Sequence, residues 1–168
     1  MLNAAAGGGA KHSPTQKGML KCGEAASYAK LRKKKATRKN QKKATFERDH
    51  VPAKATLTQA AYRRAVGVLS KARRKCIAAK IERDGIAVAI PRAMHRKHSR
   101  TCGSKNKKLK MSDSKTKKSL ADAKEKDLAD MEAAMKGTPC EAAYKEAADK
   151  VRKHDHEKTI QDALDACP

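Results

Sequence analysis

Residues 85–91 have the sequence Gly-Ile-Ala-Val-Ala-Ile-Pro, the strongest strand signal in the chain. Five apolar residues between a glycine and a proline predict a short buried strand over 86–90, because turn residues at both ends are typical of a strand inside a core. A second stretch, residues 45–52, mixes polar and apolar residues and also ends at a proline, as an extended segment that runs into a loop does. We expect these two strands to pair through 45–49.

Helical patterns fill most of the remaining sequence. Thr56 and Gln59 fit a capping box, and apolar residues then recur at helical spacing as far as Arg83. Pro91 suits the first position of a short helix. We expect helices over 24–43, 56–83, 92–98, 115–136 and from 138 to near the C-terminus, with a polar loop over 99–114. The predicted fold is mainly α with a short two-stranded β element, a helical insertion between the strands and two C-terminal helices.

The charge of the chain is strongly basic and unevenly distributed. The 168 residues include 41 Lys and Arg and 18 Asp and Glu, a formal net charge of +23. Residues 1–110 contain 30 of the basic residues and five acidic ones, whereas 111–168 contain 11 and 13. This excess predicts a polyanionic partner such as a nucleic acid. We expect a linker or the end of a delivery region over 1–20 and a single domain over 21–168, basic over 21–110 and a helical scaffold over 111–168.

Composition excludes several classes of protein. No apolar run is long enough to span a membrane, and the N-terminus lacks the order of a classical secretory signal. The four aromatic residues are too few for a sheet or OB fold that binds bases by stacking. The five cysteines include no Cys-x-x-Cys, so a zinc finger is unsupported. We expect Cys76 in the core, and the sequence does not identify the partners of any disulfide.

Chemically reactive residues lie at junctions within the basic part. Asp49 and His50 are adjacent at the end of the first strand, and His95 and His98 lie three apart on one face of the short helix. A carboxylate and an imidazole can supply a metal ligand and a general base, provided that an irregular strand end lets both converge. Phosphodiester hydrolysis needs these groups together with cations that hold the backbone. The arrangement therefore predicts a metal-dependent nuclease site.

Residues 46–55 (Phe-Glu-Arg-Asp-His-Val-Pro-Ala-Lys-Ala) and 90–103 (Ile-Pro-Arg-Ala-Met-His-Arg-Lys-His-Ser-Arg-Thr-Cys-Gly) resemble the C-terminal nuclease domains of bacterial polymorphic toxins. In that family an Asp-His-Ile/Val-Pro segment is followed by a His and then by a Ser/Thr-x-Thr-x-Gly stretch. The family is similar to the HNH and endonuclease VII group, whose core is a β-hairpin plus a helix around one metal ion. The resemblance implies a ββα-metal-like core and DNA cleavage.

The resemblance also implies a biological setting. Such a toxin is secreted without a classical signal peptide, for example as a type VI secretion effector, and acts in the cytoplasm of a recipient bacterium. An acidic immunity protein protects the producing cell.

Site residues follow from the resemblance by position. Asp49 is implied as a metal ligand, His50 as the general base and His95 as the second ligand, with His98 as an alternative ligand. The implied ion is Mg²⁺, Mn²⁺ or Zn²⁺. Nearby basic side chains are expected to contact phosphates: Arg48, Lys54, Arg96, Arg100 and Lys105.

Two other functions remain open at this point. A basic nucleic-acid-binding protein without catalytic activity, of the ribosomal or nucleoid type, explains the net charge equally well, but it does not explain the His and Asp residues at the junctions. An RNase toxin would use the same chemistry on a different polymer, and the sequence does not distinguish the two substrates. Our expectation is a DNase toxin.

Overall fold

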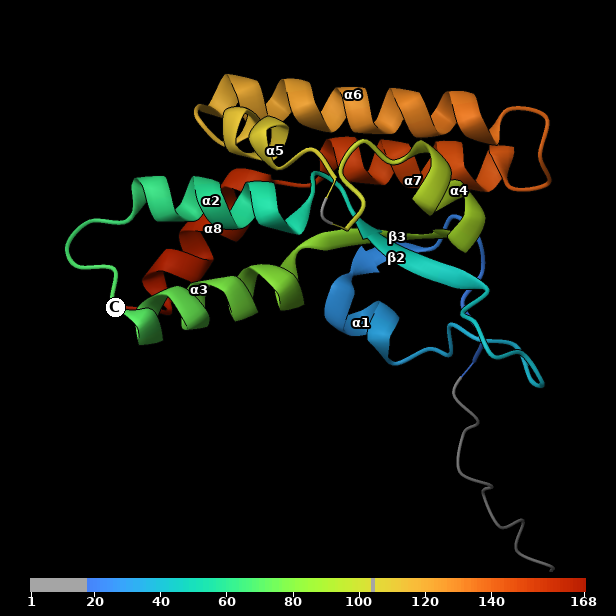
Figure 1. The fold of residues 1–168 in the computed structure, drawn as a ribbon, viewed down its shortest axis with the longest axis horizontal. Coiled ribbons are helices and arrows are strands. Elements are labelled where there is room, and N and C mark those ends of the chain that lie inside the picture. Colours follow the sequence, from blue (N-terminus) through green and yellow to red (C-terminus); the bar gives the residue numbers. More distant parts are fainter. Residues whose placement is uncertain (1–17, 104) are drawn as a thin grey trace, which may run out of the picture.

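The structure is a computed structural model that describes residues 18–103 and 105–168, and Figure 1 shows its helices arranged around a small sheet. The elements in chain order are β1 (Ala25–Ser27), α1 (Tyr28–Arg32), β2 (Phe46–His50), α2 (Lys54–Arg64), α3 (Lys71–Asp84), β3 (Ile86–Pro91), α4 (Arg92–His98), α5 (Lys107–Asp113), α6 (Lys117–Met135), α7 (Glu141–Lys153) and α8 (His156–Asp165). The expectation of a mainly α protein is confirmed. None of the helices in these two ranges is long and apolar enough to cross a membrane.

Within the described residues the sheet has three antiparallel strands, with β3 between β1 and β2, so the expected two-stranded element is wrong in its number of strands. The predicted pairing of the two strands is confirmed, and its register places Phe46 opposite Pro91 and His50 opposite Ala87. The expected helix over 24–43 is wrong, because Ala25–Ser27 form β1 and only α1 is helical there. Residues 25–27 form backbone hydrogen bonds with the edge of β3 that β2 does not use. This pairing overrides the helical propensity of these residues.

Side chains of β3 alternate between two cores, one on each face of the sheet. Val88 and Ile90 pack with residues of α6 and α7, among them Tyr144. Ala87 and Ala89 face the opposite side, which α1 and the segment before β1 cover. The central strand is buried on both faces, which explains why it has no polar residue.

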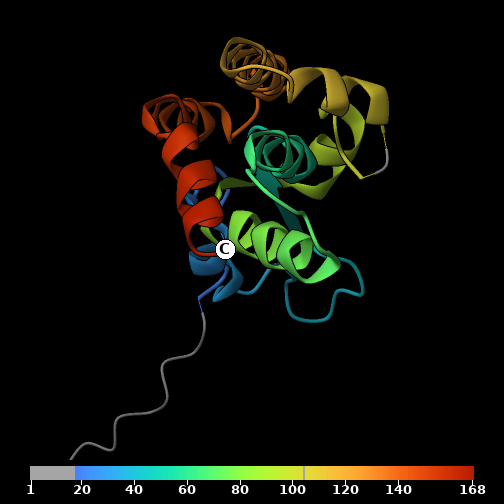
Figure 2. The same cartoon turned by 90° about the vertical axis from the view of Figure 1, so that its left-hand side faces the viewer.

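A second helical cluster packs beside the sheet. Figure 2 shows α2, α3 and α8 grouped together, and their apolar residues form one core cluster. The single helix expected over 56–83 is two helices, because residues 65–70 leave the helical path at Gly67, whose φ is +81°. Thr56 is therefore a buried residue inside α2 and not a cap. The C-terminal helical segment is also divided, with Asp155 capping α8, and the expected loop over 99–114 contains α5.

Two disulfides connect distant parts of the chain. Cys22 is bonded to Cys140 and Cys76 to Cys167, over separations of 118 and 91 residues. Cys76 lies half-buried against the helical cluster rather than inside it, and Cys102 is a free thiol. The linker expected over 1–20 lies mostly outside the described residues, but Leu20 is buried in the core, so the domain begins before residue 21.

Candidate active site

Side chains of β2 alternate between the faces of the sheet, and this alternation decides the layout of the site. Glu47 and Asp49 are paired with positions of β3 that face α6 and α7. Arg48 and His50 are paired with positions that face α1. Adjacent residues of the predicted Asp-His pair therefore point to opposite sides.

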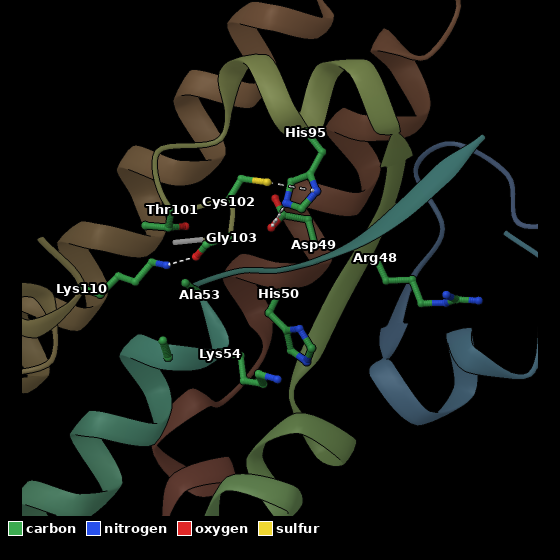
Figure 3. Close-up of a pocket in the computed structure, with 11 residues that line it drawn as sticks. Arg48, Asp49, His50, Ala53, Lys54, His95, Thr101, Cys102, Gly103 and Lys110 are labelled. Carbon is green, nitrogen blue, oxygen red and sulfur yellow. Dashed lines mark hydrogen bonds and ion pairs between the residues drawn. The ribbon is translucent and has the colours of Figure 1, made fainter. Parts of the chain in front are cut away.

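His95 lies between the two carboxylates of β2. Pro91 ends β3, and α4 begins at the next residue, so the helix is placed directly against the strands. The Nδ1 atom of His95 lies 2.6 Å from Oε2 of Glu47. Its Nε2 atom lies 3.1 Å from Oδ1 of Asp49, and Figure 3 shows this second contact. The expected meeting of Asp49 and His95 is present. Glu47 is a site residue that the sequence analysis missed, although the two-residue period of a strand places it beside Asp49.

The charges around His95 favour its protonated form. Burial of the ring opposes the positive charge, but hydrogen bonds and charges of Asp49 and Glu47 outweigh it and raise the pKa of His95. Burial likewise opposes ionisation of Glu47, but His95 and Arg96 outweigh it and lower the pKa of that carboxyl. Both Arg92 and Arg96 donate to Oε1 of Glu47, at 3.1 and 2.9 Å, which leaves Oε2 to His95.

Cys102 completes a cluster of possible metal ligands. Its Sγ atom lies 3.8 Å from Nδ1 of His95, and Glu47, His95 and Cys102 have one donor atom each within 4.8 Å of one another. Burial and the nearby carboxylates of Glu47 and Asp49 raise the pKa of the Cys102 thiol. Imidazole, carboxylate and thiol donors are those that bind divalent transition metals. The side chains present here therefore fit a divalent ion.

His50 lies on the other side of β2. Its ring stacks on Tyr28, with the ring centroids 4.6 Å apart, and its Nε2 atom lies 3.0 Å from the carbonyl oxygen of Glu82. A carbonyl only accepts, so Nε2 carries the proton and the neutral ring has its lone pair on Nδ1. Burial lowers the pKa of His50, partly offset by the bond to Glu82. The expected convergence with Asp49 at an irregular strand end is wrong, because regular alternation continues through His50.

A pocket of about 320 Å³ nevertheless brings both sides of β2 together. Asp49, His95 and Cys102 line it on one side, and His50 and Lys54 line it on the other (Figure 3). Because β2 is an edge strand, side chains from both of its faces border the same hollow at its end. The pocket is therefore a better description of the candidate site than the Asp-His pair alone.

Two of the five basic residues expected to contact phosphates, Arg48 and Arg100, are bound to other groups of the protein. The guanidinium of Arg48 donates to the carbonyls of Leu31 and Lys34 on the α1 side. Arg100 is mostly buried and pairs with Asp127 at 2.8 Å. These two arginines stabilise the fold, and the sequence does not distinguish them from basic side chains that are available to bind phosphate.

The other basic residues are nearer to solvent. Lys54 lines the pocket and pairs with Glu82 at 3.2 Å, with 46% of its side chain exposed. Arg96 is 57% exposed while holding Glu47, and the Lys105 ammonium donates to the Arg96 carbonyl. His98, at the end of α4, is outside the donor cluster found among the described residues.

The sequence was compared with protein-family models and with the curated proteins, and the structure with the solved structures, and none of them matches.

Proposed function

We propose that this protein is a metal-dependent nuclease, with DNA as the favoured substrate. The observation that carries the proposal is the pocket at the end of β2, which combines the Asp49–His95 pair with a second imidazole whose lone pair is on Nδ1. The pocket lies within residues 1–110, which hold 30 of the 41 basic residues. A polyanion is the substrate that such a charge attracts.

Each group has a role in this proposal. Asp49 and His95 would hold a divalent ion, which supplies positive charge at the scissile phosphate and a more acidic water. His50 accepts the proton of the attacking water at Nδ1, while its Nε2–H bond to Glu82 fixes the ring. Lys54, on the same side of the pocket, contacts the phosphate backbone.

The elements β2, β3 and α4 are proposed to be a ββα-metal-like core. The two strands are antiparallel, and the helix that follows them supplies His95. The helices α2 and α3 are an insertion between the strands, and α6 and α7 cover the face that carries Asp49.

An antibacterial toxin with an acidic immunity partner remains our proposal for the biological role. It rests on the resemblance of residues 46–55 and 90–103 to the polymorphic toxins, and on the positive charge of the surrounding chain. An acidic protein that covers this charge would also keep the nuclease from nucleic acid.

The decisive experiment incubates the purified protein with plasmid DNA and, separately, with total RNA. Each reaction contains Mg²⁺, Mn²⁺ or Zn²⁺, with and without EDTA, and is repeated with His50→Ala. We expect EDTA-sensitive loss of supercoiled DNA that His50→Ala slows by roughly 100-fold or more, the range for loss of a general base. The control is His154→Ala, which changes a histidine in the junction between α7 and α8 and should cleave normally.

The outcomes separate the candidate functions. Cleavage of RNA alone would favour the RNase toxin. Salt-sensitive binding without cleavage in any metal would identify a basic binding protein and would contradict the proposed enzyme.

A further inference from the structure

The two ring nitrogens of His95 face different kinds of ligand. Nε2 faces the Asp49 carboxylate, at 3.1 Å, whereas Nδ1 faces Glu47 and the Cys102 thiol. Hard ions such as Mg²⁺ prefer oxygen ligands, and a thiolate selects thiophilic ions such as zinc. The two sides of one imidazole therefore have different metal preferences.

We propose that Glu47, the Nδ1 atom of His95 and Cys102 form a zinc site, and that zinc bound there inhibits the nuclease. The inhibition rests on the proposed function, but the zinc site does not. Cys, His and carboxylate side chains are the ligands that zinc takes in proteins, and catalytic zinc sites combine three protein ligands with an open fourth position. The fourth position here faces the pocket, because His95 and Cys102 both line it.

The geometry of the cluster is close to what zinc requires. Tetrahedral zinc with bonds of about 2.0–2.3 Å separates its donors by roughly 3.3–3.8 Å. In the structure Nδ1 of His95 lies 2.6 Å from the carboxylate oxygen and 3.8 Å from the sulfur, and the three donors lie within 4.8 Å of one another. The side chains would need adjustments on the order of 1 Å.

The surrounding contacts hold the three ligands in place. Arg92 and Arg96 bind only Oε1 of Glu47, so Oε2 is oriented toward the cluster. The loop that carries Cys102 is fixed by hydrogen bonds on both sides. Lys110 donates to the carbonyl of Gly103 at 2.6 Å, and Arg100, which precedes the loop, is held by Asp127.

Inhibition follows from the proton count of the imidazole. Each ring nitrogen of His95 faces a carboxylate oxygen, so the ring donates from both nitrogens before the ion binds. Zinc binding displaces the thiol proton of Cys102 and the Nδ1 proton of His95 into solvent, and the Nε2 proton stays on the ring. A neutral imidazole has one lone pair, so Nε2 then carries a proton and donates it to Asp49. His95 is thereby removed as a ligand on the Asp49 side. Zinc and Mg²⁺ would therefore compete for His95 although they occupy different positions, zinc at Nδ1 and Mg²⁺ at Nε2.

The first test measures binding without any nuclease assay. Metal-free protein with intact disulfides is titrated with Co²⁺, which reports a sulfur ligand through a thiolate-to-cobalt charge-transfer absorption. We expect this absorption in the wild type and in Asp49→Asn, displacement by equimolar Zn²⁺, and loss of the absorption in Cys102→Ser. Zinc affinity should fall at least roughly tenfold in Cys102→Ser, since even indirect supports of a metal site cost that much.

A measurement on the wild type alone guards against misfolding of the variant. Iodoacetamide labels the free thiol Cys102, and we expect Zn²⁺ to protect it whereas Mg²⁺ does not. A Co²⁺ complex without the charge-transfer absorption, or unchanged labelling in saturating Zn²⁺, would overturn the zinc site.

Cleavage assays then test the inhibition. We expect Zn²⁺ to suppress Mg²⁺-dependent cleavage by the wild type but not by Cys102→Ser. Binding through Cys102 in a protein that cleaves nothing would overturn the nuclease and its inhibition but would support the zinc site. Mg²⁺-dependent cleavage without zinc binding at Cys102 would overturn the zinc site alone.

Discussion

The Nε2 atom of His95 lies 3.1 Å from Oδ1 of Asp49, although the two residues are 46 positions apart. The contact depends on two local features. The β2–β3 register places Asp49 on the face covered by α6 and α7, and α4 begins directly after β3, so His95 returns over the same face. The Asp49–His95 pair therefore depends on β2, β3 and α4. The helices α2 and α3, which lie between the two strands in sequence, contribute no residue to it.

Substituting Asp49 tests this pair. Asp49→Asn keeps the size of the side chain but removes the charge, so we expect Mg²⁺-dependent cleavage of plasmid DNA to fall by roughly 100-fold or more. The matched control is Asp122→Asn, because Asp122 is an exposed residue of α6 whose ion-pair partner among the described residues is Lys118. Single-turnover cleavage rates are compared after circular dichroism has shown equal folding. Equal rates for both variants would contradict a metal-binding role for Asp49.

Local patterns were sufficient to predict the elements at the centre of the fold. The apolar run of β3 follows from short-range rules, and so does the start of α4 directly after Pro91. The pairing of β2 with β3 and the meeting of Asp49 with His95 were instead expected from the resemblance of residues 46–55 and 90–103 to the toxin nucleases. Both strands have side-chain patterns that match their environment, so the local prediction and the tertiary structure agree.

Features that depend on distant contacts were not predicted. β1 exists only because the free edge of β3 pairs with it, and no local signal distinguishes it from a helix. The buried roles of Arg48 and Arg100 depend on carbonyls and carboxylates far along the chain. Cys102 reaches His95 through a loop, and no sequence rule identifies that approach. Glu47 is different, because strand periodicity alone would have identified it.

Lys54 is the basic residue whose position best supports contact with nucleic acid. It lines the pocket and is 46% exposed. We expect Lys54→Ala to weaken DNA binding and to reduce the slope of log affinity against log salt concentration by about 1. Binding is measured by fluorescence anisotropy in EDTA, so that no cleavage occurs. The control is Lys126→Ala, an exposed residue of α6 in the near-neutral part of the chain. Identical slopes for both variants would remove Lys54 from the interface.

Gly23 fixes the contact between the start of the sheet and α7. Its φ is +80°, and a Cβ atom there would lie 2.5 Å from the backbone carbonyl of Ala143. We expect Gly23→Ala to lower the free energy of unfolding by about 2 kcal/mol or more, because strain and overlap act together. Gly137→Ala is the control, since that glycine also has a positive φ but open space around it. Urea unfolding should show a clearly smaller loss there, of about 1 kcal/mol. Equal losses of unfolding free energy in the two variants would mean that the structure accommodates the new Cβ atom beside Ala143 without a measurable cost.

His156 imposes a pH-dependent cost on the fold. It is 8% exposed, and among the described residues neither ring nitrogen has a hydrogen-bond partner. Burial, together with the charges of His154 and Lys124, lowers the pKa of His156 to about 4, and the charge of Asp155 offsets this only in part. In the unfolded chain His156 binds a proton as the pH falls below about 6.5, whereas in the folded protein its ring stays neutral down to about pH 4. Stability is therefore lost as the pH falls through this window.

Replacing this histidine with leucine should remove both costs. At pH 7 we expect His156→Leu to raise the free energy of unfolding by about 1 kcal/mol, because two unpaired buried nitrogens are lost. The advantage over the wild type should then grow by an amount on the order of 3 kcal/mol between pH 7 and pH 4, as the protonation penalty disappears. Urea unfolding at several pH values measures this difference directly. The difference between the two proteins isolates this one group, since every other titrating residue is common to both. An advantage that stays constant from pH 7 to pH 4.5 would show that the native ring is protonated as readily as the unfolded one.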